Sequence, residues 1–516
     1  MLLEEFLELS AERFPDKVAL VAGTQRLTYR VLEEQANRLA HSLVELGVVR
    51  GDRVAIYLDN SVEAVLSIFA TLKAGGVFLM VNPSTKADKL AYILNNCRAK
   101  GVVCSQMRVK ELESHAGQLP HTTFAVVTGQ LPEQGQESPL HVVSIQQCLA
   151  ESKPCQRPRK QNIDIDLAAL IYTSGSTGNP KGVMLTHLNM VSAATSITTY
   201  LENRQNDIVL SVLPLAFDYG LYQVLMGFKI GGTVVLERSF AYPHAVLEKV
   251  KQEKVTGFPL VPTIAALLLQ MDLSKYDFSS VRYLTNTAAA LPTHHIDKLR
   301  SLFPQARLFS MYGLTECKRV SYLPPDQLDI RPGSVGRGMP NEEVYIVDDE
   351  GNRVGPGVVG QLVVRGSNVM MGYWEMPEAT DRVLKPGPVP GEKVLYTGDL
   401  FRMDDEGFLY FVGRKDDIIK SRGEKVSPKE VENALSSLDG VAEVAVLGVP
   451  DEILGQAVKA FIQVKVGIVL TEKDVLRHCS LHLEDFMMPK IIEFRAVLPK
   501  TANGKINKRE LGACAP

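Results

Sequence analysis

The sequence predicts an α/β fold, with helix-covered β-sheets and a β-rich subdomain in a large N-terminal domain, followed by a small α+β domain. The first observation is alternation: the strand-like VAIYL (54–58) precedes a helical SVEAVLSIFATLKAG and a second strand-like segment, VFLMVNP. Strand, helix and strand at this spacing are typical of parallel sheets covered by helices. The second observation is length, because 516 residues exceed the roughly 250–300 that one hydrophobic core supports.

Later segments repeat the alternation and then change character. IVLSVLPL, the helical GLYQVLMGFKIGG, TVVLE and the helical AVLEKVKQE continue it. Between about residues 331 and 398, Gly- and Pro-rich turns separate alternating strands such as EEVYIVDD and GQLVVRG, which predict the β-rich subdomain. After Gly413, the helical SPKEVENALSSL lies among strand-like segments such as VAEVAVLGVP. We therefore expect a large domain over residues 1–413 and a small domain over 414–516.

Composition and charge restrict the classes of function. Lys and Arg number 56 against 59 Asp and Glu, and the resulting charge of −3 argues against a partner such as nucleic acid. No segment approaches the ~20 apolar residues that a membrane helix requires, so no membrane insertion is expected. The seven cysteines are scattered, and acidic residues stand near the N-terminus where a signal peptide carries positive charge. These features favour a reduced, cytoplasmic location.

The segment IYTSGSTGNPKGVMLTH (171–187) is the most informative in the chain. It begins within an apolar strand, so its loop leaves the end of a sheet, where ligands commonly bind. Glycines let backbone N–H groups approach an anion closely, hydroxyls add donors, and a lysine adds a point charge. The order of residues differs from a Walker loop. The candidate phosphate-binding residues are Thr173, Ser174, Gly175, Ser176, Thr177, Gly178 and Lys181.

This loop resembles the signature of the adenylate-forming superfamily, which includes acyl-CoA synthetases, the adenylation enzymes of nonribosomal peptide synthesis and firefly luciferase. Four further signatures occur in the family's order and extend the resemblance over essentially the whole chain: MYGLTE (311–316), YTGDL (396–400), GRKDDIIKSRGEKVSPKEVE (413–432) and PKTANGKINKREL (499–511). The resemblance implies that a substrate carboxylate attacks the α-phosphorus of ATP and releases pyrophosphate. A phosphopantetheine thiol then attacks the resulting acyl-AMP.

The resemblance also implies roles for individual residues. Tyr312 would stack on adenine beside Gly313, and Thr315 would donate to the α-phosphate. Glu316 would be an oxygen ligand for Mg²⁺. Asp399 would present two acceptor oxygens to the hydroxyls of ribose. The predicted catalytic residues are Thr315, Glu316 and Lys505, and the remaining predicted nucleotide contacts are Ala288, Ala289 and Arg414.

Three of these expectations concern the small domain, which the resemblance makes mobile. Asp416 matches the hinge about which this domain pivots between the two half-reactions. Lys505 matches the lysine that bridges the substrate carboxylate and the α-phosphate, whereas Lys500 is expected to be peripheral. Gly423 would leave room beside the pantetheine arm after rotation.

The acid pocket is predicted from Phe217, Asp218, Tyr219, Tyr222 and Arg319. Asp218 resembles the aspartate that pairs with the α-ammonium group in amino-acid-activating members, since a buried carboxylate needs a cation. Alternatively, Asp218 faces water or caps the helix expected to begin at Tyr219. A cation directly after MYGLTE would pair with Asp218 or with an anionic substrate tail, and either pairing weakens the amino-acid hypothesis. The two tyrosines favour a small or cyclic acid.

The favoured function is activation of a small or cyclic amino acid and its transfer to a carrier protein supplied in trans, since the printed sequence contains no carrier module. The alternative is an acyl- or aryl-CoA ligase that uses free CoA. The presence of Lys505, Glu316 and Asp399 argues against an inactive scaffold, and nothing indicates luciferase-type oxygen chemistry. The expected requirements are ATP, Mg²⁺, a small carboxylic acid and a phosphopantetheine thiol, carried by a protein or by CoA.

Overall fold

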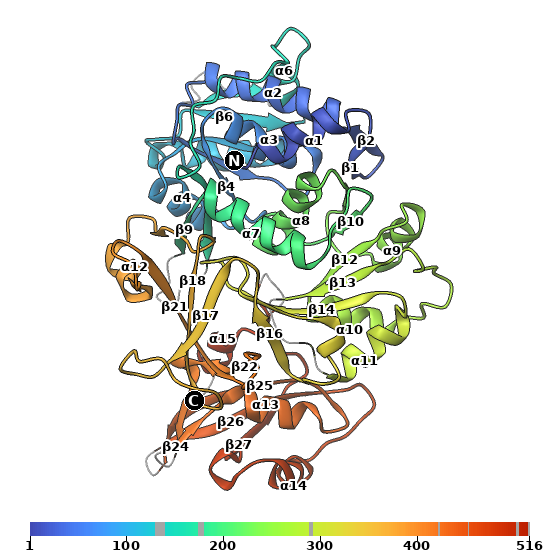
Figure 1. Ribbon diagram of the computed structural model, residues 1–516, viewed down its shortest axis with the longest axis vertical. Coiled ribbons are helices and arrows are strands. Elements are labelled where there is room, and N and C mark those ends of the chain that lie inside the picture. Colours follow the sequence, from blue (N-terminus) through green and yellow to red (C-terminus); the bar gives the residue numbers. More distant parts are fainter. Residues whose placement is uncertain are drawn as a thin grey trace.

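The computed structural model describes residues 1–129, 140–173, 180–287, 291, 293–421, 424–451, 454–501 and 505–513. Eight predicted site residues lie outside this part of the chain: Ser174, Gly175, Ser176, Thr177, Gly178, Ala288, Ala289 and Gly423. The described strands form three sheets that helices cover, two in a large N-terminal domain and one in a small C-terminal domain (Figure 1). This arrangement confirms the predicted fold class.

The largest sheet has fourteen strands among the described residues. In order across the sheet these are β17 (Glu342–Val347), β18 (Gly360–Gly366), β21 (Lys393–Met403), β22 (Leu409–Arg414), β16 (Ser334–Gly338), β15 (Ser321–Leu323), β14 (Arg307–Tyr312), β13 (Tyr283–Asn286), β12 (Gly257–Leu260), β10 (Ile208–Ser211), β11 (Thr233–Leu236), β1 (Val18–Ala22) and β2 (Gln25–Thr28), with β20 (Leu384–Pro386) beside β21. β14 pairs in parallel with β13 but antiparallel with β15. The predicted β-rich subdomain is therefore continuous with the parallel sheet.

The second sheet contains the strand that leads into the predicted phosphate loop. Its described strands, in order, are β19 (Gly372–Tyr373), β9 (Lys181–Thr186), β8 (Leu167–Thr173), β4 (Val77–Met80), β3 (Arg53–Tyr57), β5 (Ala99–Ser105), β6 (Phe124–Thr128) and β7 (His141–Ser144). β3 and β4 pair in parallel, and a helix lies between them in the sequence, as the alternation in this region predicts. β8 and β9 are antiparallel, with Thr173 opposite Lys181.

Helices pack on both large sheets. In the described chain they are α1 (Glu5–Arg13), α2 (Tyr29–Glu45), α3 (Val62–Lys73), α4 (Ala87–Asn96), α5 (Gln106–Ser114), α6 (Ile145–Cys148), α7 (His187–Tyr200), α8 (Asp218–Lys229), α9 (Pro243–Gln252), α10 (Pro262–Gln270), α11 (Thr293–Leu302) and α12 (Pro377–Val383). α7 packs on β8 and β9, α8 packs on β10 and β11, and the two helices contact each other between the sheets. None of the described helices is long and apolar enough to cross a membrane.

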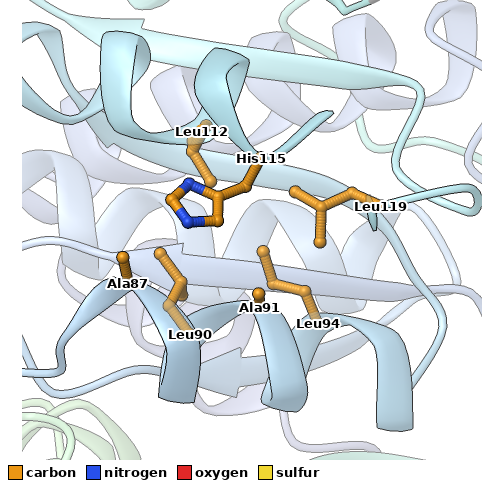
Figure 2. A pocket seen from close by; sticks show the side chains of 7 residues that line it. All are labelled: Ala87, Leu90, Ala91, Leu94, Leu112, His115 and Leu119. Carbon is orange, nitrogen blue, oxygen red and sulfur yellow. The ribbon is translucent and has the colours of Figure 1, made fainter. Parts of the chain in front are cut away.

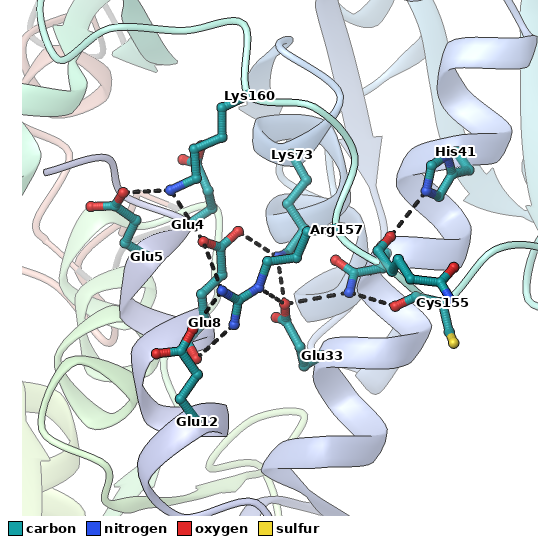
Figure 3. A network of polar contacts seen from close by, with 12 residues as sticks. Glu4, Glu5, Glu8, Glu12, Glu33, His41, Lys73, Cys155, Arg157 and Lys160 are labelled. Carbon is teal, nitrogen blue, oxygen red and sulfur yellow. Dashed lines mark hydrogen bonds and ion pairs between the residues drawn. The ribbon is translucent and has the colours of Figure 1, made fainter.

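An ionic network ties α1 to the segment before β8 (Figure 3). The ammonium group of Lys73 lies 2.7 Å from Glu8 and 2.9 Å from Glu33, and only 1% of the lysine side chain is exposed. Arg157 reaches Glu33 at 3.0 Å from the other side. Burial raises the pKa of Glu4, on the same N-terminal segment, to about 7. Breaking one partner of a buried ion pair leaves an uncompensated charge, which is costly. This network therefore holds α1 against the rest of the large domain.

The small domain contains the third sheet. Its described strands are β24 (Glu424–Val426), β23 (Ile419–Ser421), β26 (Gly455–Val464), β25 (Val441–Asp451) and β27 (Ile491–Phe494), and its helices are α13 (Pro428–Ser436), α14 (Glu472–His482) and α15 (Lys508–Ala513). β22, in the largest sheet, ends at Arg414, and the short 3-10 helix Lys415–Asp417 leads from it to β23. Asp416 is exposed in this connection. A hinge at Asp416 and a domain boundary at 413/414 remain predictions.

Candidate active site

Candidate residues gather where parallel strands of the largest sheet end. β13 ends at Asn286 and its neighbour β14 ends at Tyr312, and the carboxyl ends of adjacent parallel strands meet at one edge of a sheet. The turn after β14 is tight at Gly313. A Cβ atom there would lie 2.5 Å from the carbonyl oxygen of Lys318 and 2.9 Å from the Cα atom of Arg319. Glycine therefore permits the turn that carries the MYGLTE residues.

Tyr312, Asp399 and Arg414 form a polar group beside this turn. Asp399 stands opposite Arg414 in the antiparallel pair β21–β22. Tyr312 Oη donates to Asp399 Oδ2 at 2.5 Å, while Arg414 Nε lies 3.1 Å from Oδ1 without the alignment of a hydrogen bond. Oδ1 is thus buried with no hydrogen-bond donor among the described residues. Burial raises the pKa of Asp399, and Arg414 opposes this shift. Such an oxygen suits a hydroxyl donor, as on ribose.

Glu316, Tyr373 and Lys181 come from different parts of the fold and meet beside the same turn. Tyr373 Oη donates to Glu316 Oε1 at 2.7 Å, and the ammonium of Lys181 lies 5.2 Å from the centre of the Tyr373 ring. β19, which carries Tyr373, pairs with β9, which begins at Lys181. The arrangement places a carboxylate and a cation next to the strand end at Thr173, where the predicted phosphate loop begins.

Glu316 is the predicted ligand for Mg²⁺, and its surroundings test whether it could hold the ion. The described residues include no group of three or more His, Cys, Asp or Glu side chains that could hold a metal. Mg²⁺ in ATP sites is commonly held by one or two carboxylates together with phosphate oxygens and water. Glu316, half-buried and hydrogen-bonded by Tyr373, fits that mode as a single protein ligand. Thr315, which precedes it, is also half-buried in the turn.

Lys505 of the small domain lies close to both sides of this site. Lys505 is exposed, and the protein atoms packed around its ammonium group lower its pKa by desolvation. The carboxylates of Asp218 and Asp399 raise this pKa and Arg414 lowers it, so all three charges are near the lysine. Thr501 N–H donates to the Lys505 carbonyl oxygen at 2.7 Å. The other lysine of this segment, Lys500, instead pairs with Glu443 of β25 at 2.7 Å.

The acid side of the site contains an ion pair that the sequence analysis raised only as an alternative. Lys318 Nζ lies 3.4 Å from Asp218 Oδ2 and 4.4 Å from the ring centre of Tyr222. Lys318 has a φ of 67°, the left-handed conformation that few residues other than glycine adopt. A protein cation thus satisfies Asp218, and no substrate ammonium group is needed to do so. The observed pairing removes the main support for an amino-acid substrate.

The start of α8 also differs from the prediction. The helix begins at Asp218, Phe217 is its N-cap, and no side chain caps it. Asp218 therefore neither caps the helix nor faces water, because it is turned toward Lys318 and buried. Tyr219 is buried as well, and its hydroxyl donates to the carbonyl oxygen of Thr285 at 2.9 Å. The Phe217 ring packs edge-on against Tyr219, 6.3 Å between ring centres.

Tyr373 was missed by sequence reasoning. β19 spans only Gly372–Tyr373, too short for an alternating pattern, and nothing in the sequence links it to Glu316. Two pockets lie outside the group of predicted residues. A small apolar one between α4 and α5 is lined by leucines, alanines and His115 (Figure 2). A larger one of about 250 Å³ lies beside Ser310 of β14 and is also lined by residues of α11.

The structure combines a large N-terminal domain and a small C-terminal domain, and polar residues of the large domain gather at a strand end near Lys505 of the small domain. Residues 7–374 match the AMP-binding enzyme family, and residues 430–505 match the AMP-binding enzyme C-terminal domain. The chain belongs to the AMP-binding enzyme family. This finding confirms the resemblance to adenylate-forming enzymes. The protein is an AMP-forming acid–thiol ligase.

The chain is similar to two CoA ligases and to a further ATP-bound protein over nearly its full length. A long-chain-fatty-acid–CoA ligase of Salmonella typhimurium is 33% identical, over 99% of this chain and 94% of the relative. The structure of an anthranilate CoA ligase in complex with anthranoyl-AMP is 30% identical with a TM-score of 0.90, covering 99% of this chain and 97% of that one. ATP-bound MatB from Rhodopseudomonas palustris is 28% identical with a TM-score of 0.88, covering 99% and 98%.

These similarities bear on the acceptor thiol. They support ATP, a small-molecule carboxylic acid and CoA as the substrates. The alternative in the sequence analysis, an acyl- or aryl-CoA ligase, is therefore better supported than its favoured function, which required a carrier protein. Transfer to a carrier protein is not shown by any of them.

Proposed function

We propose that this protein is an acyl- or aryl-CoA ligase that forms an acyl-AMP intermediate from ATP and a carboxylic acid and then transfers the acyl group to free CoA. The observation that carries the proposal is the position of Lys505. It is near Asp399 and Arg414 on the ribose side and near Asp218 on the acid side. A cation between the two sites neutralises the approach of two anions, the carboxylate and the α-phosphate.

The residues of the large domain would orient ATP for this first half-reaction. Asp399 would accept hydrogen bonds from the ribose hydroxyls through Oδ1, which has no hydrogen-bond donor among the described residues, and Tyr312 holds the opposite oxygen in place. Lys181 and Arg414 contribute positive charge at the phosphates, and Thr315 a hydroxyl donor. Glu316 would hold Mg²⁺, which when bound withdraws charge from the phosphate oxygens. We propose that Thr315, Glu316 and Lys505 are the catalytic residues.

The second half-reaction would require the small domain to turn. The short connection at Lys415–Asp417 joins the two domains and contains Asp416, and hinge residues commonly lie in such connections between elements. Rotation there would remove Lys505 from the site and bring the segment around Gly423 toward the pantetheine arm. CoA then attacks the carbonyl carbon of acyl-AMP through its thiolate, and AMP leaves.

A comparison of Lys505→Ala with Lys500→Ala tests this division of roles. We expect Lys505→Ala to lose ATP–pyrophosphate exchange by at least about a hundredfold, because a charge aligned with the transition state is removed. Thioester formation from supplied acyl-AMP and CoA should remain. Lys500→Ala, which breaks only an ion pair within the small domain, should retain both. Equal loss of both half-reactions in Lys505→Ala would contradict the proposal.

A further inference from the structure

Arg319 is a buried cation that no carboxylate of the described chain neutralises. Only 2% of the residue is exposed, and it is the largest fully buried side chain. Its guanidinium makes no hydrogen bond or ion pair with another described residue, and Nε is buried without an acceptor. Its contact is with the ring of Tyr219, 5.3 Å from the guanidinium carbon to the ring centre. An unpaired buried charge is costly, so the missing anion requires an explanation.

The carboxylates near Arg319 already have other partners. Asp218 pairs with Lys318 at 3.4 Å. Glu342, which like Arg319 lies near Tyr200, accepts from Asn368 Nδ2 at 2.9 Å. Burial raises the pKa of Glu342 well above its usual value, which favours the neutral acid. Burial lowers the pKa of Lys318 to about 7, so Lys318 does not add a full positive charge at neutral pH. The guanidinium of Arg319 is therefore the permanent cation beside Asp218 and Lys318.

The location of Arg319 connects its unpaired guanidinium to the acid pocket. Arg319 packs on Tyr219, and the hydroxyl of Tyr219 reaches Thr285 at the end of β13, next to the strand end that holds Tyr312. The guanidinium thus contacts Tyr219 and lies near Lys318, beside residues predicted for the acid pocket. A guanidinium presents a planar fork of donors that matches a carboxylate in a bidentate pair.

We infer that the acid substrate carries a second anionic group, with a carboxylate as the reference chemistry, and that Arg319 binds this group while the other carboxylate reacts. The inference rests on the proposed function. A diacid supplies the absent anion, whereas a monocarboxylic acid leaves the guanidinium unpaired. A substrate with an ammonium group at its far end would meet the like charge of Arg319, while Asp218 is already paired with Lys318. Arg319 is thus a specificity-determining residue.

The test compares acids of matched size that differ in the second carboxylate: butanoate with succinate, hexanoate with adipate, and benzoate with isophthalate. In ATP–pyrophosphate exchange, we expect the wild-type enzyme to prefer the diacid by at least about tenfold in kcat/KM in one or more pairs. Arg319→Met should raise KM for that diacid at least about tenfold, leave KM for ATP unchanged and remove the preference. Arg319→Lys should retain part of the preference.

The comparison of acids with the wild-type enzyme does not require any variant to fold. In Arg319→Met, an unchanged KM for ATP would show that the rise in KM for the diacid is not caused by a general disturbance of the structure. Equal or better exchange with the monoacids would overturn the inference and leave the proposed function standing. A change in kcat/KM by the same factor for mono- and diacids in Arg319→Met would likewise overturn the inference and leave the proposed function standing. The absence of exchange with every acid in the panel would overturn both.

Discussion

Replacement of Asp399 with asparagine tests the proposed ribose contact. In the wild-type chain Oδ2 accepts from Tyr312, and Oδ1 is buried without a hydrogen-bond donor among the described residues. We expect the single carbonyl oxygen of asparagine to stay with Tyr312, which leaves an NH₂ group that cannot accept from ribose. Hydrogen bonds to a charged acceptor contribute about 1.5–3 kcal/mol. This loss corresponds to an increase of about 10- to 150-fold in KM for ATP.

The assay is ATP–pyrophosphate exchange at a fixed acid concentration with varied ATP. Asp329→Asn is the matched control, because Asp329 pairs with Arg300 at 2.6 Å on the exposed surface and should not affect KM. The amide NH₂ would replace Oδ1, which lies 3.1 Å from Arg414 Nε, so a thermal melt of each variant establishes that the enzymes compared are folded at the assay temperature. A folded Asp399→Asn enzyme whose KM for ATP stays within about twofold of wild type would refute the ribose assignment.

Three further predictions follow from the described contacts. Gly313→Ala should destabilise the protein by about 1–3 kcal/mol in urea denaturation, because its Cβ would lie 2.5 Å from the Lys318 carbonyl oxygen; an unchanged midpoint would contradict this. Tyr373→Phe removes the 2.7 Å hydrogen bond to Glu316 and should raise the Mg²⁺ concentration for half-maximal exchange about 10- to 100-fold. Glu4 has a pKa raised from 4.5 to about 7, so the folded state holds its proton more tightly and loses stability as pH rises from 4.5 to 7. Glu4→Gln should therefore be more stable than wild type at pH 8, by up to about 3 kcal/mol, and similar at pH 4. Equal differences at both pH values would show that Glu4 does not titrate in this way.

Much of the fold is predictable because its strands and helices differ in local periodicity. The segment from Val54 onward reads as strand, helix and strand, and the structure has β3, α3 and β4 there. The continuity of the β-rich subdomain with the largest sheet is not predictable in this way. It depends on β16 approaching β15 so closely that a Cβ at Gly336 would lie 1.7 Å from the carbonyl oxygen of Tyr322.

Some residues of the candidate site can be predicted from short sequence motifs, and others are brought together only by the packing of the fold. MYGLTE and YTGDL contain the residues that meet as Tyr312 and Asp399, so their nearness follows from the family pattern. Asp218 and Lys318 are far apart in the sequence, and their ion pair depends on the left-handed backbone at Lys318. Both charged residues are visible in the sequence, but their pairing is not. The sequence-based interpretation therefore assigned a substrate ammonium group to Asp218.

The most direct test of the central claim is a product analysis with ATP, Mg²⁺, CoA and the panel of mono- and dicarboxylic acids. The account predicts AMP, pyrophosphate and acyl-CoA in equal amounts, and acyl-AMP without acyl-CoA when CoA is omitted. Formation of ADP, or acyl-AMP that holo carrier protein captures and CoA does not, would contradict an AMP-forming ligase that uses free CoA.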